Sequence, residues 1–236
     1  MKTMQKMYTC KIKLFITIII LLVPIVAYSQ SYEDDNPHQY KNAIALKDIY
    51  NTILIEQEIK DPDFYLAIVF PEMMRFFVSR DELETLLTKI TYTTINDYEG
   101  CSIGPFQIKP SFAENVEKII SQDKELQKRY PSLVIDSKNS FSSKYDRIIR
   151  LQNKRMQILY LLAFVDICKK KYNLNNLQDI EQLKVISTAY NVGLIDLKQL
   201  EKFYDKKWFP EGKNSESSKW NYSELVIHYY LIFHSN

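Results

Sequence analysis

Apolar residues recur along this chain at helical spacing, and short polar stretches separate the runs. Between residues 43 and 58 they recur every three to four positions, which predicts an amphipathic helix. The same spacing predicts further helices at 63–78, 111–120, 148–168, 179–190, 194–204 and 222–233. The segment 148–168 is apolar on more than one face, which is typical of a buried central helix.

Local signals add boundaries between these helices. Ser79-Arg80-Asp81-Glu82 has the Ser-x-x-Glu form of a capping box, so another helix is expected from about residue 81 to 90. The segment 91–99, rich in Thr and Ile, is interpreted as a short strand or an irregular turn. Polar stretches at 137–144 and 210–219 predict loops. The pattern predicts an all-α or α-dominated fold with at most a small β element.

The first 29 residues have the features of a secretory signal peptide. Four lysines and no acidic residue lie in the first thirteen positions, and an apolar run extends from Leu14 to Ala27. This run contains Pro24 and is shorter than the about 20 apolar residues that a membrane-spanning helix needs. We predict cleavage after Ser29, with an uncleaved N-terminal anchor as the alternative. Either way, we expect a protein exported from a bacterial cell, periplasmic or associated with the envelope.

The remaining chain reads as a polar lead-in followed by one domain. Residues 30–42 are expected to be flexible, and residues 43–236 are expected to form a single domain. Removing the signal peptide removes four of the 31 basic residues and none of the 29 acidic ones, leaving 27 against 29. The formal charge of +2 therefore belongs to the targeting segment. Because no net basic charge remains, nucleic acid is not an expected partner.

The cysteines and histidines predict neither a metal nor a cofactor. Cys101 and Cys168 would pair in an oxidising envelope if their Cα atoms lie within about 7 Å, and two buried free thiols are the alternative. The histidines are scattered, with no acidic residue or cysteine at metal-ligand spacing. These histidines are His38, His228 and His234.

Three of the four glycines lie in two short segments. Gly100 and Gly104 belong to Gly-Cys-Ser-Ile-Gly-Pro-Phe-Gln-Ile-Lys-Pro, and Gly193 ends Ala-Tyr-Asn-Val-Gly. Glycine permits main-chain conformations closed to other residues and lets a ligand approach the backbone closely. We therefore expect these segments to bend sharply or to meet a substrate. For Gly193 the ordinary alternative is a helix C-cap.

The two segments resemble motifs of the lysozyme-like superfamily, in particular soluble lytic transglycosylases and goose-type lysozymes. In that superfamily a glutamate on a helix precedes a Gly-Leu-Met-Gln-like block and an Ala-Tyr-Asn-x-Gly block. Gly104-Pro105-Phe106-Gln107 is similar to the first block, with Pro-Phe in place of Leu-Met, and residues 189–193 match the second. The resemblance implies a lysozyme-like domain that cleaves peptidoglycan glycan strands between N-acetylmuramic acid and N-acetylglucosamine.

The glutamate that fits this pattern is Glu72, the single carboxylate in the apolar segment 64–80. An apolar surrounding disfavours the charged form and so raises the pKa of a carboxyl group, as a catalytic acid near neutral pH requires. The competing interpretation is an ordinary surface ion pair with Arg75, three residues further along the helix. Glu99, beside the glycine block, is the alternative acid.

The resemblance also implies roles for the other motif residues. In the family, the glutamate protonates the glycosidic oxygen and then takes a proton from the 6-hydroxyl of the sugar, giving a 1,6-anhydromuramoyl end. Gln107 and the backbone at Gly104 would hold a sugar amide or hydroxyl, and Tyr190 and Asn191 would position Glu72 and the sugar. The expected substrate-binding set also includes Ser102 and Phe106. The ordinary alternatives are core packing for Tyr190 and a loop hydrogen bond for Gln107.

Departures from the family pattern leave other functions open. Met73 follows the glutamate where the family usually has serine, and 31 residues separate Glu72 from Gly104, more than is usual. If water replaces the 6-hydroxyl, the same acid serves a hydrolytic muramidase, with Asp97 or Glu99 as the base. A non-catalytic envelope protein that binds glycan with the same fold, or an unrelated helical exported protein, are the remaining alternatives. Peptidoglycan strands are the expected partner, and the sequence specifies no envelope protein partner.

Overall fold

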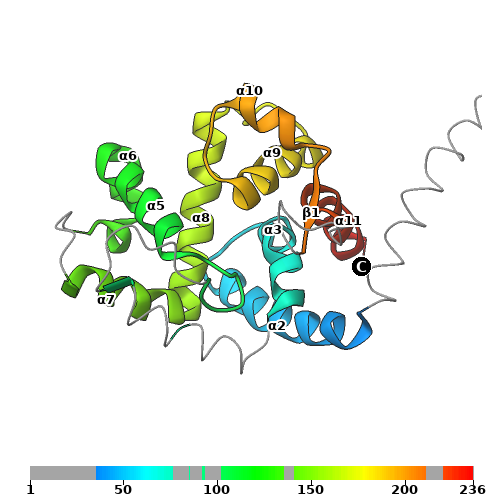
Figure 1. Ribbon diagram of the computed structural model, residues 1–236, viewed down its shortest axis with the longest axis horizontal. Helices are drawn as coiled ribbons and strands as arrows, with labels where there is room; N and C mark the ends of the chain where they lie inside the picture. Colours follow the sequence, from blue (N-terminus) through cyan, green and yellow to red (C-terminus); the bar gives the residue numbers. More distant parts are fainter. Residues whose placement is uncertain are drawn as a thin grey trace, which may run out of the picture. The chain divides into compact units, whose positions relative to one another are not determined.

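The computed structural model describes residues 36–76, 85, 92–93, 102–135, 141–210 and 220–235. The chain divides into two compact units, residues 1–41 and 42–236, and of the first unit only residues 36–41 are described. The predicted signal peptide therefore lies outside the described residues. The described part of the second unit consists of helices and one small antiparallel sheet, so the predicted α-dominated fold is confirmed (Figure 1).

Most of the described elements are α-helices. The α-helices are α2 (Pro37–Glu56), α3 (Pro62–Arg75), α5 (Pro110–Gln122), α6 (Lys124–Arg129), α7 (Phe141–Gln152), α8 (Lys154–Lys171), α9 (Asp179–Val192), α10 (Leu197–Leu200) and α11 (Tyr222–His234). The remaining elements are the 3-10 helices η1 (Pro131–Leu133) and η2 (Glu201–Phe203) and the paired strands β1 (Lys207–Phe209) and β2 (Trp220–Asn221). In the second unit, α8 runs between α5, α6 and α7 on one side and α3 and α9 on the other (Figure 1).

Several predicted helices match the structure closely. The predicted ranges 63–78, 111–120, 179–190 and 222–233 correspond to α3, α5, α9 and α11, with ends that differ by a few residues. None of the described helices combines the length and apolar character that a membrane span requires.

Other predicted boundaries are wrong, for local reasons. Helix α2 begins at Pro37, inside the expected lead-in, and proline is well suited to a first helical turn. The predicted helix 148–168 is two helices, because Asn153 Oδ1 accepts a hydrogen bond from Met156 N at 3.2 Å and starts a new helix. The loop predicted at 137–144 gives way to α7 from Phe141 onward.

Three further predictions meet the structure only in part. The range 194–204 contains the short α10 and η2 in place of one helix. Tyr92 and Thr93 are helical where a strand or irregular turn was expected. The helix predicted at 81–90 lies outside the described residues apart from Thr85, which is helical.

The core of the second unit places α3, the helix that carries Glu72. Helix α11 packs against α3, where the rings of Phe70 and Tyr229 lie 4.4 Å apart. Pro71 inside α3 removes one helical hydrogen bond. The Tyr222 hydroxyl donates to the carbonyl of Ile68 at 2.9 Å, in the same turn. These contacts anchor the last turns of α3, so the position of Glu72 depends on α11.

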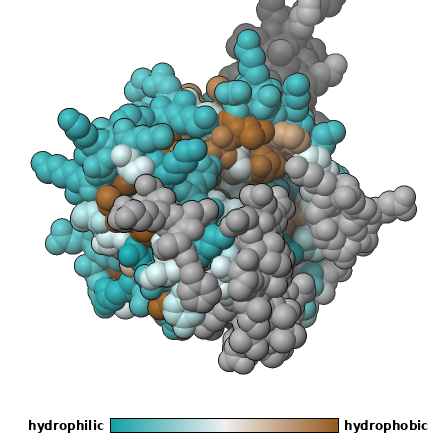
Figure 2. All heavy atoms as spheres, turned by 60° about the vertical axis from the view of Figure 1, so that its left-hand side comes forward, coloured by the Kyte–Doolittle hydropathy of each residue, from teal (hydrophilic) through white to brown (hydrophobic). Residues whose placement is uncertain are grey.

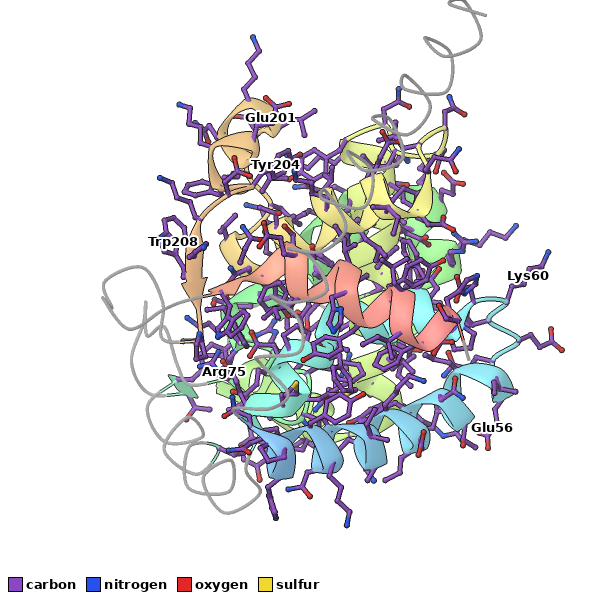
Figure 3. The ribbon with its side chains drawn as sticks, turned by 90° about the vertical axis from the view of Figure 1, so that its right-hand side faces the viewer. Glu56, Lys60, Arg75, Glu201, Tyr204 and Trp208 are labelled. Carbon is purple, nitrogen blue, oxygen red and sulfur yellow. The ribbon has the colours of Figure 1, made fainter. Side chains whose placement is uncertain are left out.

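The described part of the face shown in Figure 2 is mostly polar. Figure 2 shows hydrophilic residues over most of the described face that it presents, with hydrophobic residues gathered in a smaller area. Figure 3 shows Arg75 of α3 and Trp208 of β1 on one side of the second unit. These two residues belong to the rim of the cleft described next.

Candidate active site

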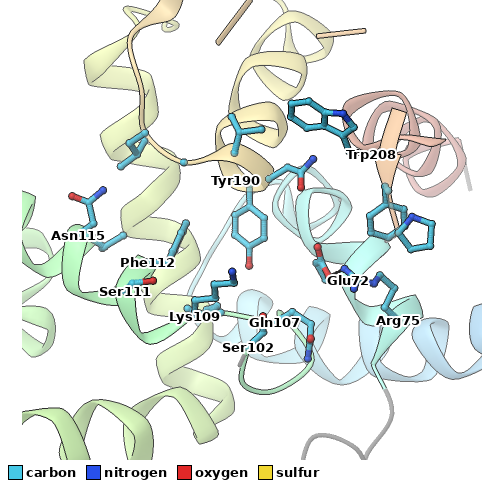
Figure 4. A pocket seen from close by; sticks show the side chains of 18 residues that line it. Glu72, Arg75, Ser102, Gln107, Lys109, Ser111, Phe112, Asn115, Tyr190 and Trp208 are labelled. Atoms are coloured by element: carbon cyan, nitrogen blue, oxygen red, sulfur yellow. Dashed lines mark hydrogen bonds and ion pairs between the residues drawn. The ribbon is translucent and has the colours of Figure 1, made fainter. Parts of the chain in front are cut away.

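A cleft of about 530 Å³ lies where α3, the segment 102–109, the start of α5, the end of α9 and strand β1 meet (Figure 4). This volume falls within the range of about 300–1,000 Å³ that is usual for ligand pockets. Five of the residues predicted from the sequence line it: Glu72, Ser102, Gln107, Tyr190 and Asn191. The cleft therefore joins three segments that lie far apart in the sequence.

The other predicted site residues have different positions. Gly104 and Phe106 are buried and are not part of the described lining. Asp97 and Glu99, the alternative carboxylates, lie outside the described residues. Among the described lining residues Glu72 is the only acidic one.

Glu72 is a buried carboxylate on the last turn of α3. Its side chain is 11% exposed, and Arg75 Nη1 donates to Glu72 Oε2 at 3.1 Å. The ion pair considered from the sequence therefore exists, but the carboxylate in it is enclosed by the protein. Arg75 is 39% exposed and lies over the ring of Phe209, 5.3 Å from its centroid, which fixes the guanidinium at the rim of the cleft.

Two opposing influences act on the pKa of Glu72. Burial is the larger, because it disfavours the charged form, and it raises the pKa above the usual value of a glutamate. The positive charges of Arg75 and Lys109 and the hydrogen bond from Arg75 act in the opposite direction. The net result is a raised pKa, so Glu72 keeps its proton to a higher pH than an exposed glutamate does.

The segment 103–108 forms a tight turn that faces the cleft. Ile103 and Ile108 exchange backbone hydrogen bonds of 3.0 and 3.2 Å, and Gln107 N donates to Gly104 O at 2.8 Å. Gly104 has a φ of +69°, and a Cβ added there would lie 1.8 Å from Nε2 of Gln157. Glycine is therefore required at this position both for the conformation of the turn and for its close approach to α8.

The side chain of Gln107 takes part in the turn and in the cleft. Its Nε2 donates to Gly104 O at 3.0 Å, so the loop hydrogen bond considered from the sequence is present. The side chain nevertheless lines the cleft, and no described residue donates to its Oε1. That oxygen is an acceptor that a ligand can use.

Gln157 on α8 holds the turn 103–108 by a hydrogen bond to its backbone. This residue was not predicted from the sequence. Its Oε1 accepts from Phe106 N at 3.3 Å and from the Tyr50 hydroxyl at 3.4 Å, while its Nε2 donates to Leu151 O at 2.6 Å. Phe106 packs on Tyr50 with ring centroids 4.4 Å apart. The sequence signal that could have indicated the role of Gln157 is a single glutamine among the apolar residues of a predicted buried helix.

Tyr190 links α9 to the turn beside Glu72. Its hydroxyl donates to Phe106 O at 2.6 Å, and its ring packs against Phe112 and Phe164 at centroid distances of 5.4 and 5.6 Å. Burial, with a smaller contribution from the charge of Glu72, raises the pKa of Tyr190 well above its usual value. The hydroxyl therefore stays protonated, and the residue both packs in the core and lines the cleft.

The end of α9, next to Tyr190, also lines the cleft. Gly193 N donates to Ala189 O at 2.8 Å, so the C-cap interpretation of Gly193 is confirmed. Its φ is +100°, and a Cβ added there would meet no atom within 4 Å. Gly193 therefore leaves the adjoining part of the cleft open.

Further lining residues were not identified from the sequence, because some lie in or near the glycine-containing segment without being motif positions and the others are far from either segment. They come from the start of α5 and from β1: Lys109, Ser111, Phe112, Asn115, Trp208 and Phe209. Figure 4 shows Asn115 and Ser111 toward one end of the cleft and Trp208 and Arg75 toward the other, with Tyr190 between them. Beyond Glu72, the described lining of the cleft thus combines polar, aromatic and aliphatic side chains, as is usual for ligand pockets.

Two further predictions from the sequence concern the cysteines and metal binding. Cys168 is fully buried in α8, and Cys101 lies outside the described residues, so their pairing is not tested. Within the described ranges, no group of three or more His, Cys, Asp or Glu side chains is arranged to hold a metal ion.

Comparison of the chain with protein-family models, with curated proteins and with solved structures gives no match in any of the three. Any functional inference therefore depends on the geometry of the cleft and on the motifs that line it.

Proposed function

We propose that this protein is a peptidoglycan lytic transglycosylase that cleaves glycan strands between N-acetylmuramic acid and N-acetylglucosamine with Glu72 as its acid and base. The observation that carries the proposal is the meeting of Glu72, Gln107 and Tyr190 in one cleft. These three residues come from three segments that resemble motifs of the lysozyme-like superfamily, and they are far apart in the sequence. An unrelated helical protein has no reason to bring them together.

In the first step, neutral Glu72 donates its proton to the glycosidic oxygen, and the bond from that oxygen to C1 of the muramoyl sugar breaks. The positive charge that develops at C1 is supported by the N-acetyl oxygen of the substrate itself. Burial of Glu72 raises its pKa, so the neutral form needed here is available closer to neutral pH.

In the second step, ionised Glu72 takes the proton of the 6-hydroxyl, whose oxygen attacks C1 and closes the 1,6-anhydro ring. No water is consumed, and the carboxyl group returns to its neutral form. Arg75, 3.1 Å from Glu72, stabilises the ionised form between the two steps. A buried carboxyl group with one adjacent cation thus suits both halves of the reaction.

A hydrolytic muramidase is the second candidate. Glycosidases that use water commonly place two carboxylates beside the bond. The described lining contains Glu72, the one carboxylate that the single-glutamate mechanism needs, whereas Asp97 and Glu99, the bases that a muramidase would use, lie outside the described residues. In either case we propose an exported protein, cleaved after Ser29, that acts in the periplasm or at the cell envelope.

The test is mass analysis of muropeptides that the purified protein, cut after Ser29, releases from sacculi. We expect products with 1,6-anhydromuramoyl ends, lighter by one water than the products of hydrolysis. Glu72→Gln keeps the shape of the side chain but cannot donate the proton, so release should fall by at least about 100-fold. Glu125→Gln, which changes a carboxylate that is 85% exposed on α6, is the matched control and should behave as wild type.

The outcomes separate the candidate functions. Reducing muramoyl ends in place of anhydro ends would identify the muramidase. Binding of glycan strands with no release by the wild type would identify the non-catalytic protein. Equal release by Glu72→Gln and the wild type would remove Glu72 from its role and overturn the proposal.

A further inference from the structure

The charged residues of the cleft are unevenly paired. Its described lining contains three of them: Glu72, Arg75 and Lys109. Arg75 is bonded to Glu72, whereas Lys109 is exposed and has no carboxylate within ion-pair distance among the described residues. The first turn of α5, which begins just after Lys109, contains no acidic side chain. Among the described residues, one cation of the cleft is therefore left without an ion-pair partner.

This arrangement makes the cleft complementary to an anion. When Glu72 is ionised, its charge is offset by Arg75 and the charge of Lys109 remains; when Glu72 is neutral, both cations remain. The described lining is thus net positive in both protonation states of the carboxyl group. Unpaired charge of one sign in a concave site favours a ligand group of the opposite sign.

The backbone at Lys109 is well fixed while its side chain is not. Lys109 O accepts from Ala113 N at 3.1 Å, and the preceding Ile108 is paired with Ile103. The Lys109 side chain makes no capping hydrogen bond to α5. Figure 4 shows it directed into the space that Tyr190 and Glu72 also line. The backbone of Lys109 is thus held in place, while its ammonium group is available to contact a ligand.

We propose that Lys109 binds a carboxylate of the substrate next to the bond that Glu72 protonates. This inference rests on the proposed function and narrows its substrate to strands that carry an acidic group at the cut site. Two sources supply that group: the lactyl carboxylate of N-acetylmuramic acid without a stem peptide, or a carboxylate of the stem peptide itself. A strand built from N-acetylglucosamine alone has neither.

The test compares Lys109→Met with Lys109→Arg, which retains the charge, and with Lys118→Met. Lys118 lies on α5, which begins directly after Lys109, is exposed and does not line the described part of the cleft, so it is a matched control for loss of one positive charge. Each variant is assayed on peptide-free glycan strands, on strands with stem peptides and on chitin oligosaccharides. Because Lys109 is exposed and its side chain makes no capping hydrogen bond, Lys109→Met should fold as wild type, which a urea unfolding curve verifies.

Lys109→Met should raise KM about tenfold on strands that carry the recognised carboxylate and leave kcat nearly unchanged, because a charged hydrogen bond to bound substrate is lost. Lys109→Arg and Lys118→Met should stay close to wild type. An effect confined to peptide-free strands identifies the lactyl group, and an effect confined to peptide-bearing strands identifies the stem peptide. Equal KM values for Lys109→Met and Lys118→Met on both kinds of strand would overturn the inference, as would an equal loss on chitin oligosaccharides.

A separate measurement distinguishes this failure from failure of the proposed function. Binding of the same strands to Glu72→Gln, with and without Lys109→Met, requires no cleavage. If the wild type releases nothing but Lys109→Met weakens binding of carboxylate-bearing strands, the proposed reaction is wrong and the carboxylate site stands. If cleavage occurs and binding is indifferent to Lys109, the reaction stands and the carboxylate site is wrong.

Discussion

The pKa of Glu72 is determined by two opposing influences. Enclosure in α3 and its neighbours raises the pKa of the carboxyl group, while Arg75 at 3.1 Å lowers it. Neither contact alone would suit a group that must give up a proton and then recover one. The balance between them is therefore expected to set the pH range of the reaction.

Arg75→Met tests this balance. Removing the guanidinium removes a contact that favours the ionised form, so the pKa of Glu72 should rise further. Because the first step of the proposed reaction needs neutral Glu72, the decline of kcat/KM at high pH should move to higher pH than in the wild type. Arg75→Lys keeps a positive charge and should shift the profile less. A profile that is unchanged in Arg75→Met would mean that Glu72 does not titrate in this range.

For single residues, the sequence identified Glu72 as a candidate but did not predict which side chains surround it. One carboxylate among apolar neighbours indicated burial, and the residue is indeed buried. The pairing with Arg75 was one of two alternatives, and the structure shows both burial and pairing. The uncommitted charge of Lys109 could not be predicted, because it depends on which side chains the fold brings near it.

Among the elements, the turn 103–108 owes its shape to a contact with α8. Gly104 lies directly against the amide of Gln157, which in turn accepts from Phe106 N. Tyr190 donates to the carbonyl of Phe106 from the opposite side. The turn that carries Gln107 is thus held between α8 and α9.

A double-mutant cycle tests this contact. Gly104→Ala should cost about 1–2 kcal/mol of unfolding free energy for the left-handed backbone, and a further about 1–3 kcal/mol because Gln157 is displaced from buried partners. In the Gln157→Ala background the added methyl meets no amide, so Gly104→Ala should cost only the backbone part. Urea unfolding of the four proteins measures the difference. Additive costs would show that the two residues do not interact.

The element boundaries illustrate where periodicity ceases to be informative. Apolar spacing located α3, α5, α9 and α11, because it reports which face of a helix is covered. It merged α7 and α8, because the apolar positions continue through Asn153 and the capping bond that separates the helices is polar. It also placed the start of α2 too late, since its first turns are largely polar.

In the second unit, a buried network of charged and hydroxyl groups joins α5, α7 and α8. Arg147 of α7 bonds Glu117 of α5 at 2.6 Å, and the Tyr160 hydroxyl of α8 donates to the same carboxylate. Tyr92 donates to Glu114 and accepts from Arg147. The first turns of α5 line the cleft, so this network places one of its walls.

Replacing Arg147 tests the importance of this network. Arg147→Met leaves Glu117, whose side chain is 6% exposed, buried without its cation, and should cost about 3–5 kcal/mol of unfolding free energy. Arg155→Met removes an exposed pair with Glu56, whose side chains are 61% and 50% exposed, and should cost at most about 1 kcal/mol. Urea midpoints at equal slope give both values. Similar costs for the two variants would contradict a stabilising role of burial in this network.

By itself, the sequence determined the α-dominated fold and the approximate places of several helices, and it singled out Glu72, Gly104 and Gly193 as candidates. Each of these follows from local chemistry: apolar spacing, an isolated carboxylate or a backbone that needs glycine. The tertiary structure alone decided that five of the predicted site residues line one cleft, that Gln157 supports its turn and that Lys109 has no ion-pair partner among the described residues. Those features depend on which side chains from distant segments meet, and local spacing carries no information about that meeting.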